Sequence, residues 1–292
     1  MNIKTLYIFS RLLRINHWIK NFIIFIPLFF SGELINLSLL IISIKIFFLF
    51  SFVASSCYII NDLIDKQKDI LHPKKSKRPL ANEDIKPINA LILAILIMTT
   101  SLGAAFIINK KIFFIFLIYI VLNIIYSKYI KKIAILDVIF IIFFYVLRGF
   151  IGGISIEIKL SWWLIVLLAT SSLFLILSKR YSEPDSIKLI TRPYFYIKYK
   201  IYIKNIMIIL TIFSIFFYYF YTIKHISLIN NLYLFLAIIQ FLTFSLIFIY
   251  YLYSVLYKNN YGESPENFYK DKVLLFLVII YFETMFIIKY LL

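Results

Sequence analysis

The sequence predicts an all-α, polytopic integral membrane protein. Its 292 residues are 63% hydrophobic and only 15% charged, whereas a soluble domain averages about half apolar and a quarter charged residues. The apolar residues form nine runs, each close to the ~20 residues that a helix needs to cross a bilayer. These runs are continuously apolar and do not alternate as the strands of a membrane barrel do. The composition therefore excludes a soluble globule and a disordered chain.

The nine apolar runs follow one another along the whole chain. They occupy residues 15–31, 38–61, 87–108, 112–127, 134–153, 160–178, 205–223, 228–256 and 273–292. Pro27 and Gly32 interrupt the first run, and the eighth is long enough to tilt in the bilayer. About nine transmembrane helices are therefore expected, in a single domain that covers residues 1–292.

The basic residues indicate the orientation of these helices. Of the 31 Lys and Arg, 24 lie either between the N-terminus and Lys20 or in alternate connections, at 62–86, 128–132, 179–204 and 257–272. The positive-inside rule makes these loops cytoplasmic, with the N-terminus inside and the C-terminus outside the inner membrane. Eleven of the 14 acidic residues lie on the same side. Mixed charge on one face suggests a cytoplasmic active site more than a simple anchor.

Several other classes of function have little support. The single Cys57 excludes an intramolecular disulfide and a cysteine metal cluster. The three histidines are scattered along the chain. The tyrosines and lysines at 194–202 are typical of a membrane-interface segment, so the net charge of +17 is not attributed to nucleic-acid binding.

The segment from Asn61 to Leu80 contains the most informative polar pattern. If the second helix continues into it, Asp62, Asp65 and Asp69 lie on one face, at i, i+3 and i+7. Three stacked carboxylates repel one another unless cations neutralise them. One interpretation is a solvated helix end that pairs with neighbouring lysines. The other is a Mg²⁺ site, because Mg²⁺ takes oxygen ligands and bridges carboxylates to substrate phosphates.

The residues that follow favour the second interpretation. Four cations occur within five positions, at Lys74, Lys75, Lys77 and Arg78. Carboxylates for a metal beside cations for phosphate oxygens are typical of a diphosphate site. His72, just before a proline, is expected to fix this loop more than to act in catalysis.

The motifs of this chain, and the order in which they occur, resemble those of the UbiA-type intramembrane prenyltransferases. The pattern NDxxDxxxD at 61–69 looks like the first aspartate-rich motif of that superfamily. Its extension, HPxKxxRPLA, is similar to the decaprenyl-phosphate phosphoribosyltransferase branch. Weaker motifs follow the same order, at His17–Asn21, Pro27–Gly32, Tyr126–Lys128, Leu136–Val138, Arg148–Gly149, Gly152–Gly153, Leu177–Glu183 and Gly262–Glu266. Asn82 and Glu83 depart from the branch, which usually has a small residue and glycine there.

The resemblance implies a fold, a cofactor and a reaction. The helices would surround a central cavity that opens laterally to lipid. Mg²⁺ would be held by the catalytic residues Asp62, Asp65 and Asp69, with Asn61 in support. The enzyme would transfer 5-phosphoribosyl from 5-phosphoribosyl diphosphate to polyprenyl phosphate and release diphosphate, as a pentosyltransferase of cell-envelope polysaccharide synthesis.

The candidate substrate-binding residues are polar groups near the cytoplasmic helix ends or inside a helix. They are Lys20, Asn61, Lys75, Arg78, Tyr126, Lys128, Asp137, Arg148, Lys179 and Arg180. Arg148 lies eleven residues after Asp137, on nearly the same helix face, so it faces a phosphate or pairs with Asp137. Lys179 and Arg180 end a helix, where the dipole favours cations in any case. The three glycines that follow Arg148 within five residues are expected to allow close helix packing.

Two alternative functions remain open. A lipid-linked transporter or flippase would suit the helix count, but the sequence has no paired halves with matching broken helices. An aromatic (4-hydroxybenzoate or quinone) polyprenyltransferase would share the fold and the first motif. Such enzymes carry a second aspartate-rich motif between the sixth and seventh helices. Here Ser178–Ser186 lacks DxxxD spacing and begins with two cations, which favours the phosphoribosyl donor.

Overall fold

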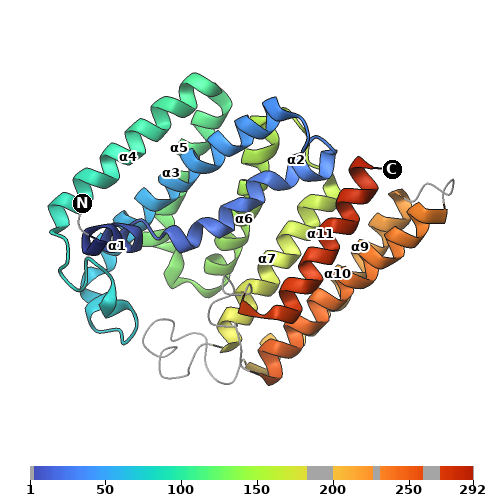
Figure 1. The fold of residues 1–292 in the computed structure, drawn as a ribbon. Coiled ribbons are helices and arrows are strands. Elements are labelled where there is room, and N and C mark those ends of the chain that lie inside the picture. The colour runs from blue at the N-terminus through green and yellow to red at the C-terminus, as the bar shows by residue number, and fades with distance from the viewer. Residues whose placement is uncertain (1–2, 183–199, 226–230, 259–269, 292) are drawn as a thin grey trace. The chain divides into compact units, whose positions relative to one another are not determined.

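The computed structural model describes residues 3–182, 200–225, 231–258 and 270–291, and every regular element in these ranges is a helix (Figure 1). Eight of the helices are long and apolar enough to cross a membrane. The all-α, polytopic architecture predicted from composition is therefore confirmed. The expected loop segments at 183–199 and 259–269 lie outside the described residues, and with them the motif at Gly262–Glu266.

The helices follow the apolar runs closely. In chain order they are α1 (Ile3–Leu12), η1 (Ile15–Phe25), α2 (Ile26–Ser31), α3 (Leu37–Ile70), η2 (Lys75–Lys77), α4 (Pro87–Ile108), α5 (Lys110–Lys128), η3 (Ile130–Lys132), α6 (Ala134–Ser155), α7 (Trp162–Ser182), α9 (Lys200–His225), α10 (Asn231–Tyr257) and α11 (Lys272–Tyr290). The elements labelled η are 3₁₀ helices.

Local residues explain where several helices begin and end. The side chain of Asn36 caps α3 by accepting from the backbone N–H of Leu39, and Asp271 caps α11 in the same way. Pro87 opens α4, where a missing N–H has no cost. Gly32 ends α2 with a left-handed φ of 86°, which a side chain would oppose.

The first expected crossing, 15–31, differs from the other eight. It is an 11-residue 3₁₀ helix followed by a 6-residue α-helix, and so it is not among the eight long helices. A 3₁₀ helix rises about 2.0 Å per residue and an α-helix about 1.5 Å, so the two together span about 31 Å. That length matches the hydrocarbon core of a bilayer, which is about 30 Å. The ninth crossing therefore stays a prediction.

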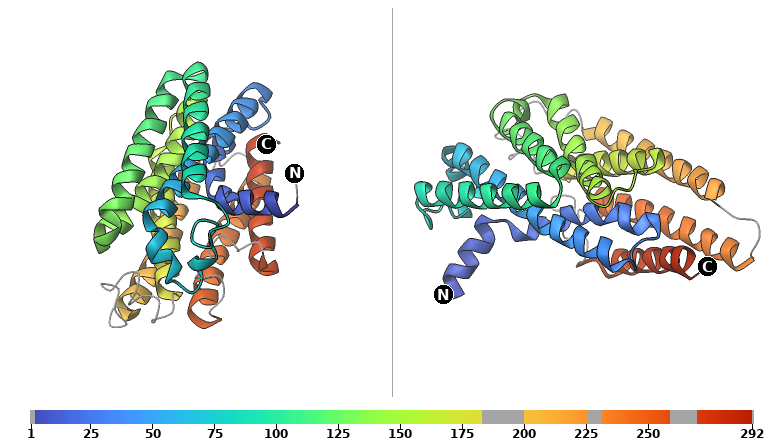
Figure 2. Two further views of the ribbon diagram at one scale, coloured as in Figure 1. Left: turned by 90° about the vertical axis from the view of Figure 1, so that its left-hand side faces the viewer. Right: turned by 90° about the horizontal axis from the view of Figure 1, so that it is seen from above.

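The chain divides into two compact units, residues 1–140 with 147–159 and residues 141–146 with 160–292. In the first unit, α3 packs against α4, α5 and η1 (Figures 1 and 2). Leu12 of α1, Ile59 of α3 and Leu80 of the loop before α4 are almost fully buried in one cluster. This cluster fixes the chain on both sides of the loop that carries the predicted cations. A single domain over 1–292 stays a prediction.

The second unit contains α7, α9, α10 and α11. There α10 packs against α9 and α11, and α9 packs against α7. Aromatic side chains fill much of its core: the rings of Tyr218 and Phe244 stack with centroids 4.0 Å apart. The hydroxyl groups of Tyr218 and Tyr281 lie 3.1 Å apart. Because this pair satisfies two buried hydroxyls inside an apolar bundle, it stabilises the unit.

Candidate active site

The second apolar helix continues beyond the membrane-length run, as the aspartate pattern requires. α3 extends to Ile70, so Asp62, Asp65 and Asp69 all lie on one regular helix. Asp62 and Asp69 are each only 3% exposed. Buried carboxylates need partners, and the structure supplies a cation for each of the three aspartates.

Arg78 joins two of these carboxylates. Its Nη1 donates to Asp62 Oδ1 at 2.9 Å and to Asp69 Oδ2 at 2.5 Å. This shared contact confirms that residues seven apart on α3 lie on the same face. Arg14 donates to the same Asp62 oxygen from the other side, and its guanidinium lies 4.8 Å from the centre of the Tyr58 ring.

Asp65 pairs with a different cation. Lys131 Nζ lies 2.7 Å and 2.6 Å from the two carboxylate oxygens of Asp65, and 3.4 Å from Asn61 Oδ1. Lys131 belongs to η3, the short 3₁₀ helix after α5. Three oxygens from two α3 residues thus surround one small cationic group.

The loop that carries Arg78 is ordered by His72, as expected. His72 is buried, and its Nδ1 accepts from the backbone N–H groups of Lys74 and Lys75 at 3.1 and 3.2 Å. Leu80, 1% exposed, fixes the far end of the loop in the hydrophobic cluster. The loop is therefore held at both ends, and Arg78 projects from between them onto α3.

Three more of the predicted residues form separate contacts in the first unit. The Tyr126 hydroxyl donates to Asp137 Oδ1 at 2.7 Å, and Asp137 is fully buried. Arg148 donates from Nε to Asn21 Oδ1 at 2.9 Å, and its expected contact with a phosphate or with Asp137 stays a prediction. Gly152 lies directly against the backbone carbonyl of Ile24, so the predicted close packing of this glycine is confirmed.

Lys75 lies in η2, and four further predicted cations lie on three other helices. Lys20 lies on η1 with its Nζ 3.4 Å from His17 Nδ1. Lys128 is exposed at the end of α5. Lys179 and Arg180 end α7 in the second unit, and Arg180 is 3% exposed. Sequence reasoning chose Lys128 and missed Lys131 and Arg14, which contact the aspartates.

The donor chemistry of the aspartate cluster fits a hard divalent cation. Its oxygens come from three carboxylates and one amide, the ligand types that Mg²⁺ prefers. In the described residues no three acidic, histidine or cysteine side chains converge as metal ligands, and each of the three carboxylates pairs with Arg14, Arg78 or Lys131. Asp65 and Asn61 nevertheless already converge on one cationic atom. The residues fit a metal that would displace these cations.

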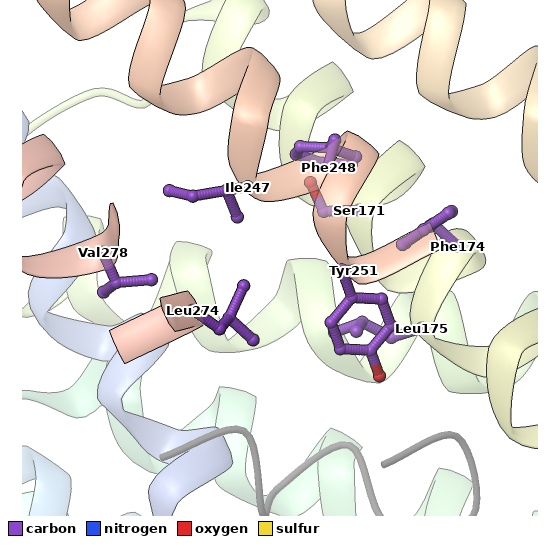
Figure 3. Close-up of a pocket in the computed structure, with 8 residues that line it drawn as sticks. All are labelled: Ser171, Phe174, Leu175, Ile247, Phe248, Tyr251, Leu274 and Val278. Atoms are coloured by element: carbon purple, nitrogen blue, oxygen red, sulfur yellow. The ribbon is translucent and has the colours of Figure 1, made fainter. Parts of the chain in front are cut away.

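The second unit contains an apolar cavity of about 230 Å³ (Figure 3). Its walls come from α7, α10 and α11, and the lining residues are Ser171, Phe174, Leu175, Ile247, Phe248, Tyr251, Leu274 and Val278. Only Ser171 and Tyr251 among these eight carry a hydroxyl group. Such a lining suits a hydrocarbon chain and offers little to a charged ligand.

Known proteins resemble this chain in both sequence and fold. Decaprenyl-phosphate phosphoribosyltransferase of Mycobacterium tuberculosis is 29% identical over 175 residues, 59% of this chain and 58% of that protein. The protein of the same name from Mycolicibacterium smegmatis is 32% identical over 174 residues, 58% of this chain and 55% of that protein. The matches thus span little more than half the length of these relatives.

The fold comparison covers nearly the whole chain. A UbiA homolog from Archaeoglobus fulgidus, solved with GPP and Mg²⁺ bound, aligns with a TM-score of 0.65 at 17% identity over 95% of this chain and 99% of that one. The sequence profile of the UbiA prenyltransferase family matches residues 22–183, more than half of the chain. That range contains the aspartates, Arg78 and Lys131. The chain belongs to the UbiA prenyltransferase family.

Proposed function

We propose that this protein transfers the 5-phosphoribosyl group from 5-phosphoribosyl diphosphate to a polyprenyl phosphate and releases diphosphate. The observation that carries the proposal is the end of α3, where three aspartates are matched by Arg14, Arg78 and Lys131. Oxygen ligands for a metal and cations for phosphates are thus adjacent. The names of the phosphoribosyltransferase relatives support this donor.

The charge balance at α3 favours a metal-bound polyanion as the donor. Three carboxylates and three cations sum to zero, so a divalent cation would make the cluster net positive. We assign Mg²⁺ to Asp62, Asp65 and Asp69, with Asn61 in support. When bound, Mg²⁺ would stabilise the charge that develops on the leaving diphosphate. Arg78 and Lys131, once free of the carboxylates, would bind phosphate oxygens directly.

The reaction itself asks little acid–base work of the protein. An oxygen of the polyprenyl phosphate forms a bond to C1 of the ribose, while the bond from C1 to the diphosphate oxygen breaks. The acceptor is already an anion and the leaving group departs as one, so no proton transfer is required. The protein's task is to hold both phosphates in line and to exclude water.

The acceptor needs an apolar path and a cationic end. The cavity among α7, α10 and α11 has a lining that suits an isoprenoid segment. Lys179 and Arg180 lie one turn beyond the lining residue Leu175 on α7, where they would bind the lipid phosphate. The basic loops favour a site at the cytoplasmic face of the inner membrane.

The test uses purified protein with polyprenyl phosphate, 5-phosphoribosyl diphosphate and Mg²⁺. Diphosphate release with formation of a phosphoribosyl lipid is expected, together with loss of both in EDTA and recovery with Mg²⁺. Asp62→Asn should abolish turnover in a protein that remains folded. Prenylation of 4-hydroxybenzoate from a polyprenyl diphosphate, with no use of the sugar donor, would overturn the proposal and favour the aromatic alternative. Full activity in EDTA would overturn the metal site.

A further inference from the structure

The 3₁₀ helix η1 is unusually long. It runs for 11 residues, from Ile15 to Phe25, whereas 3₁₀ helices longer than three or four residues are uncommon because their hydrogen bonds are poorly aligned. Arg14, directly before it, adopts a left-handed conformation with φ 51° and ψ 48°, which costs a residue with a side chain about 1 kcal/mol or more. Other contacts must therefore hold this segment in place.

Polar contacts tie η1 to α3 in antiparallel order. Asn21 Nδ2 donates to Ser51 Oγ at 2.9 Å, and Trp18 Nε1 donates to Ser55 Oγ at 3.0 Å. Both serines are fully buried. Ser51 and Ser55 are one helical turn apart on α3, and Asn21 and Trp18 are one turn apart on η1.

The same order continues to the aspartate cluster. The rings of His17 and Tyr58 lie 5.7 Å apart. The Arg14 guanidinium contacts both Tyr58 and Asp62. From Asn21 back to Arg14, η1 and the residue before it therefore follow α3 from Ser51 to Asp62.

The 3₁₀ form brings the length from Arg14 to Asn21 closer to the length from Ser51 to Asp62 than an α-helix would. Ser51 and Asp62 are eleven residues apart on an α-helix, about 16 Å. Arg14 and Asn21 are seven residues apart, which gives about 14 Å at the 3₁₀ rise but only about 10.5 Å at the α-helical rise. An α-helical η1 would therefore place the Arg14 backbone about 3.5 Å farther from Asp62 along α3 while Asn21 stays on Ser51.

A buried arginine fixes the far end of this stretched segment. Arg148 is 5% exposed, and its Nε donates to Asn21 Oδ1 at 2.9 Å. The guanidinium also lies 5.5 Å from the centre of the Phe50 ring. Asn21 is thus held by Arg148 of α6 and Ser51 of α3 at once.

A steric contact adjoins this hydrogen bond. Four residues after Arg148, Gly152 lies so close to the carbonyl of Ile24 that an added Cβ would collide with the backbone. Ile24 is itself fully buried and lies three residues after Asn21. One turn of α6 and one turn of η1 are therefore joined by two adjacent contacts, one polar and one steric.

We propose that Arg148 is a positioning residue. With Asn21 and Gly152 it holds η1 at its 3₁₀ length, and this sets where Arg14 meets Asp62 in the donor site. Its effect on turnover rests on the proposed function, whereas its effect on the position of η1 does not. Arg148 therefore acts through Arg14 and does not bind a substrate phosphate.

The position of η1 can be measured without any substrate. In a Cys57→Ser background, spin labels at Asn16→Cys and Lys68→Cys report the distance between η1 and the polar end of α3, since both positions are exposed. Asn21→Ala or Gly152→Ala should shift or broaden this distance by about 3.5 Å, the difference in rise over seven residues. Gly103→Ala is the matched control, because nothing lies within 4 Å of its added Cβ. An unchanged distance in both Asn21→Ala and Gly152→Ala would overturn the proposal.

Steady-state kinetics test whether the contacts of Arg148 and Gly152 with η1 act through Arg14. Asn21→Ala and Arg148→Lys should each lower kcat/KM for the sugar donor about 10-fold or more, as misplaced groups do. The loss should vanish in an Arg14→Gln background, where the group that these contacts position is already absent. Additive losses would show that Arg148 acts on the substrate itself and would overturn the proposal. If no variant has activity, the distance measurement still decides whether Arg148, Asn21 and Gly152 hold η1 in position.

Discussion

Replacement of Arg78 by methionine tests the charge balance at the end of α3. The Arg78 guanidinium contacts Asp62 and Asp69, whose side chains are each 4% exposed, while its own side chain is 24% exposed. Removing one partner of a buried ion pair costs about 3–5 kcal/mol, and an exposed pair contributes about 1 kcal/mol at most. Because Arg78 is partly exposed, Arg78→Met should cost about 2–3 kcal/mol. Asp62 retains Arg14, so the loss falls mainly on Asp69.

Thermal unfolding in detergent measures this loss. A cost of 2–3 kcal/mol corresponds to a Tm lower by about 4–12 °C. Lys77→Met is the matched control, since it removes an exposed cation from the same loop and should leave Tm nearly unchanged. Adding Asp69→Asn to Arg78→Met removes the unpaired carboxylate and should recover at least half of the stability. A wild-type Tm for Arg78→Met, or no recovery in the double variant, would refute the reasoning.

Three further predictions concern other parts of the molecule. Lys131→Met should raise KM for the sugar donor at least 10-fold while Lys128→Met leaves it nearly unchanged; equal effects in steady-state kinetics would contradict the assignment of Lys131. His72→Ala should lower stability by about 1–2 kcal/mol, because two backbone N–H groups lose their acceptor; chemical denaturation and protease cleavage within 72–78 measure this, and a loop that stays equally protected would count against it. A reporter inserted after Lys77 should behave as cytoplasmic and a C-terminal fusion as external; a cytoplasmic C-terminus would rule out nine crossings.

Much of the fold follows from the sequence because hydropathy and helix length are local properties. The eight long helices lie where the apolar runs predict them. The continuation of α3 through Asp69 follows from spacing alone, since only a helix places residues 62, 65 and 69 on one face. The sequence also identifies Arg78, because it belongs to a dense run of cations next to those aspartates.

The partners of the aspartates were harder to predict. Arg14 and Lys131 come from segments 48 and 66 residues away from Asp62 and Asp65, and neither stands out from the basic residues around it. Lys128 and Lys131 look alike in sequence, yet η3 turns Lys131 toward α3 and leaves Lys128 exposed. Nothing in the hydropathy of residues 15–25 distinguishes a 3₁₀ rise from an α-helical one.

The end of α3 can be both a stable part of the protein and a site for charged ligands because each charge there has a partner. Arg14, Arg78 and Lys131 come from three separate elements, so the ion pairs also fasten η1, the 71–80 loop and η3 to one helix. On the proposed function, a divalent metal takes over the carboxylates while the donor phosphates take over the cations. Each group then exchanges one partner of opposite charge for another, and no buried charge is left unpaired. Because the metal and the phosphates release each other's binding groups, we expect each to bind tightly only in the presence of the other.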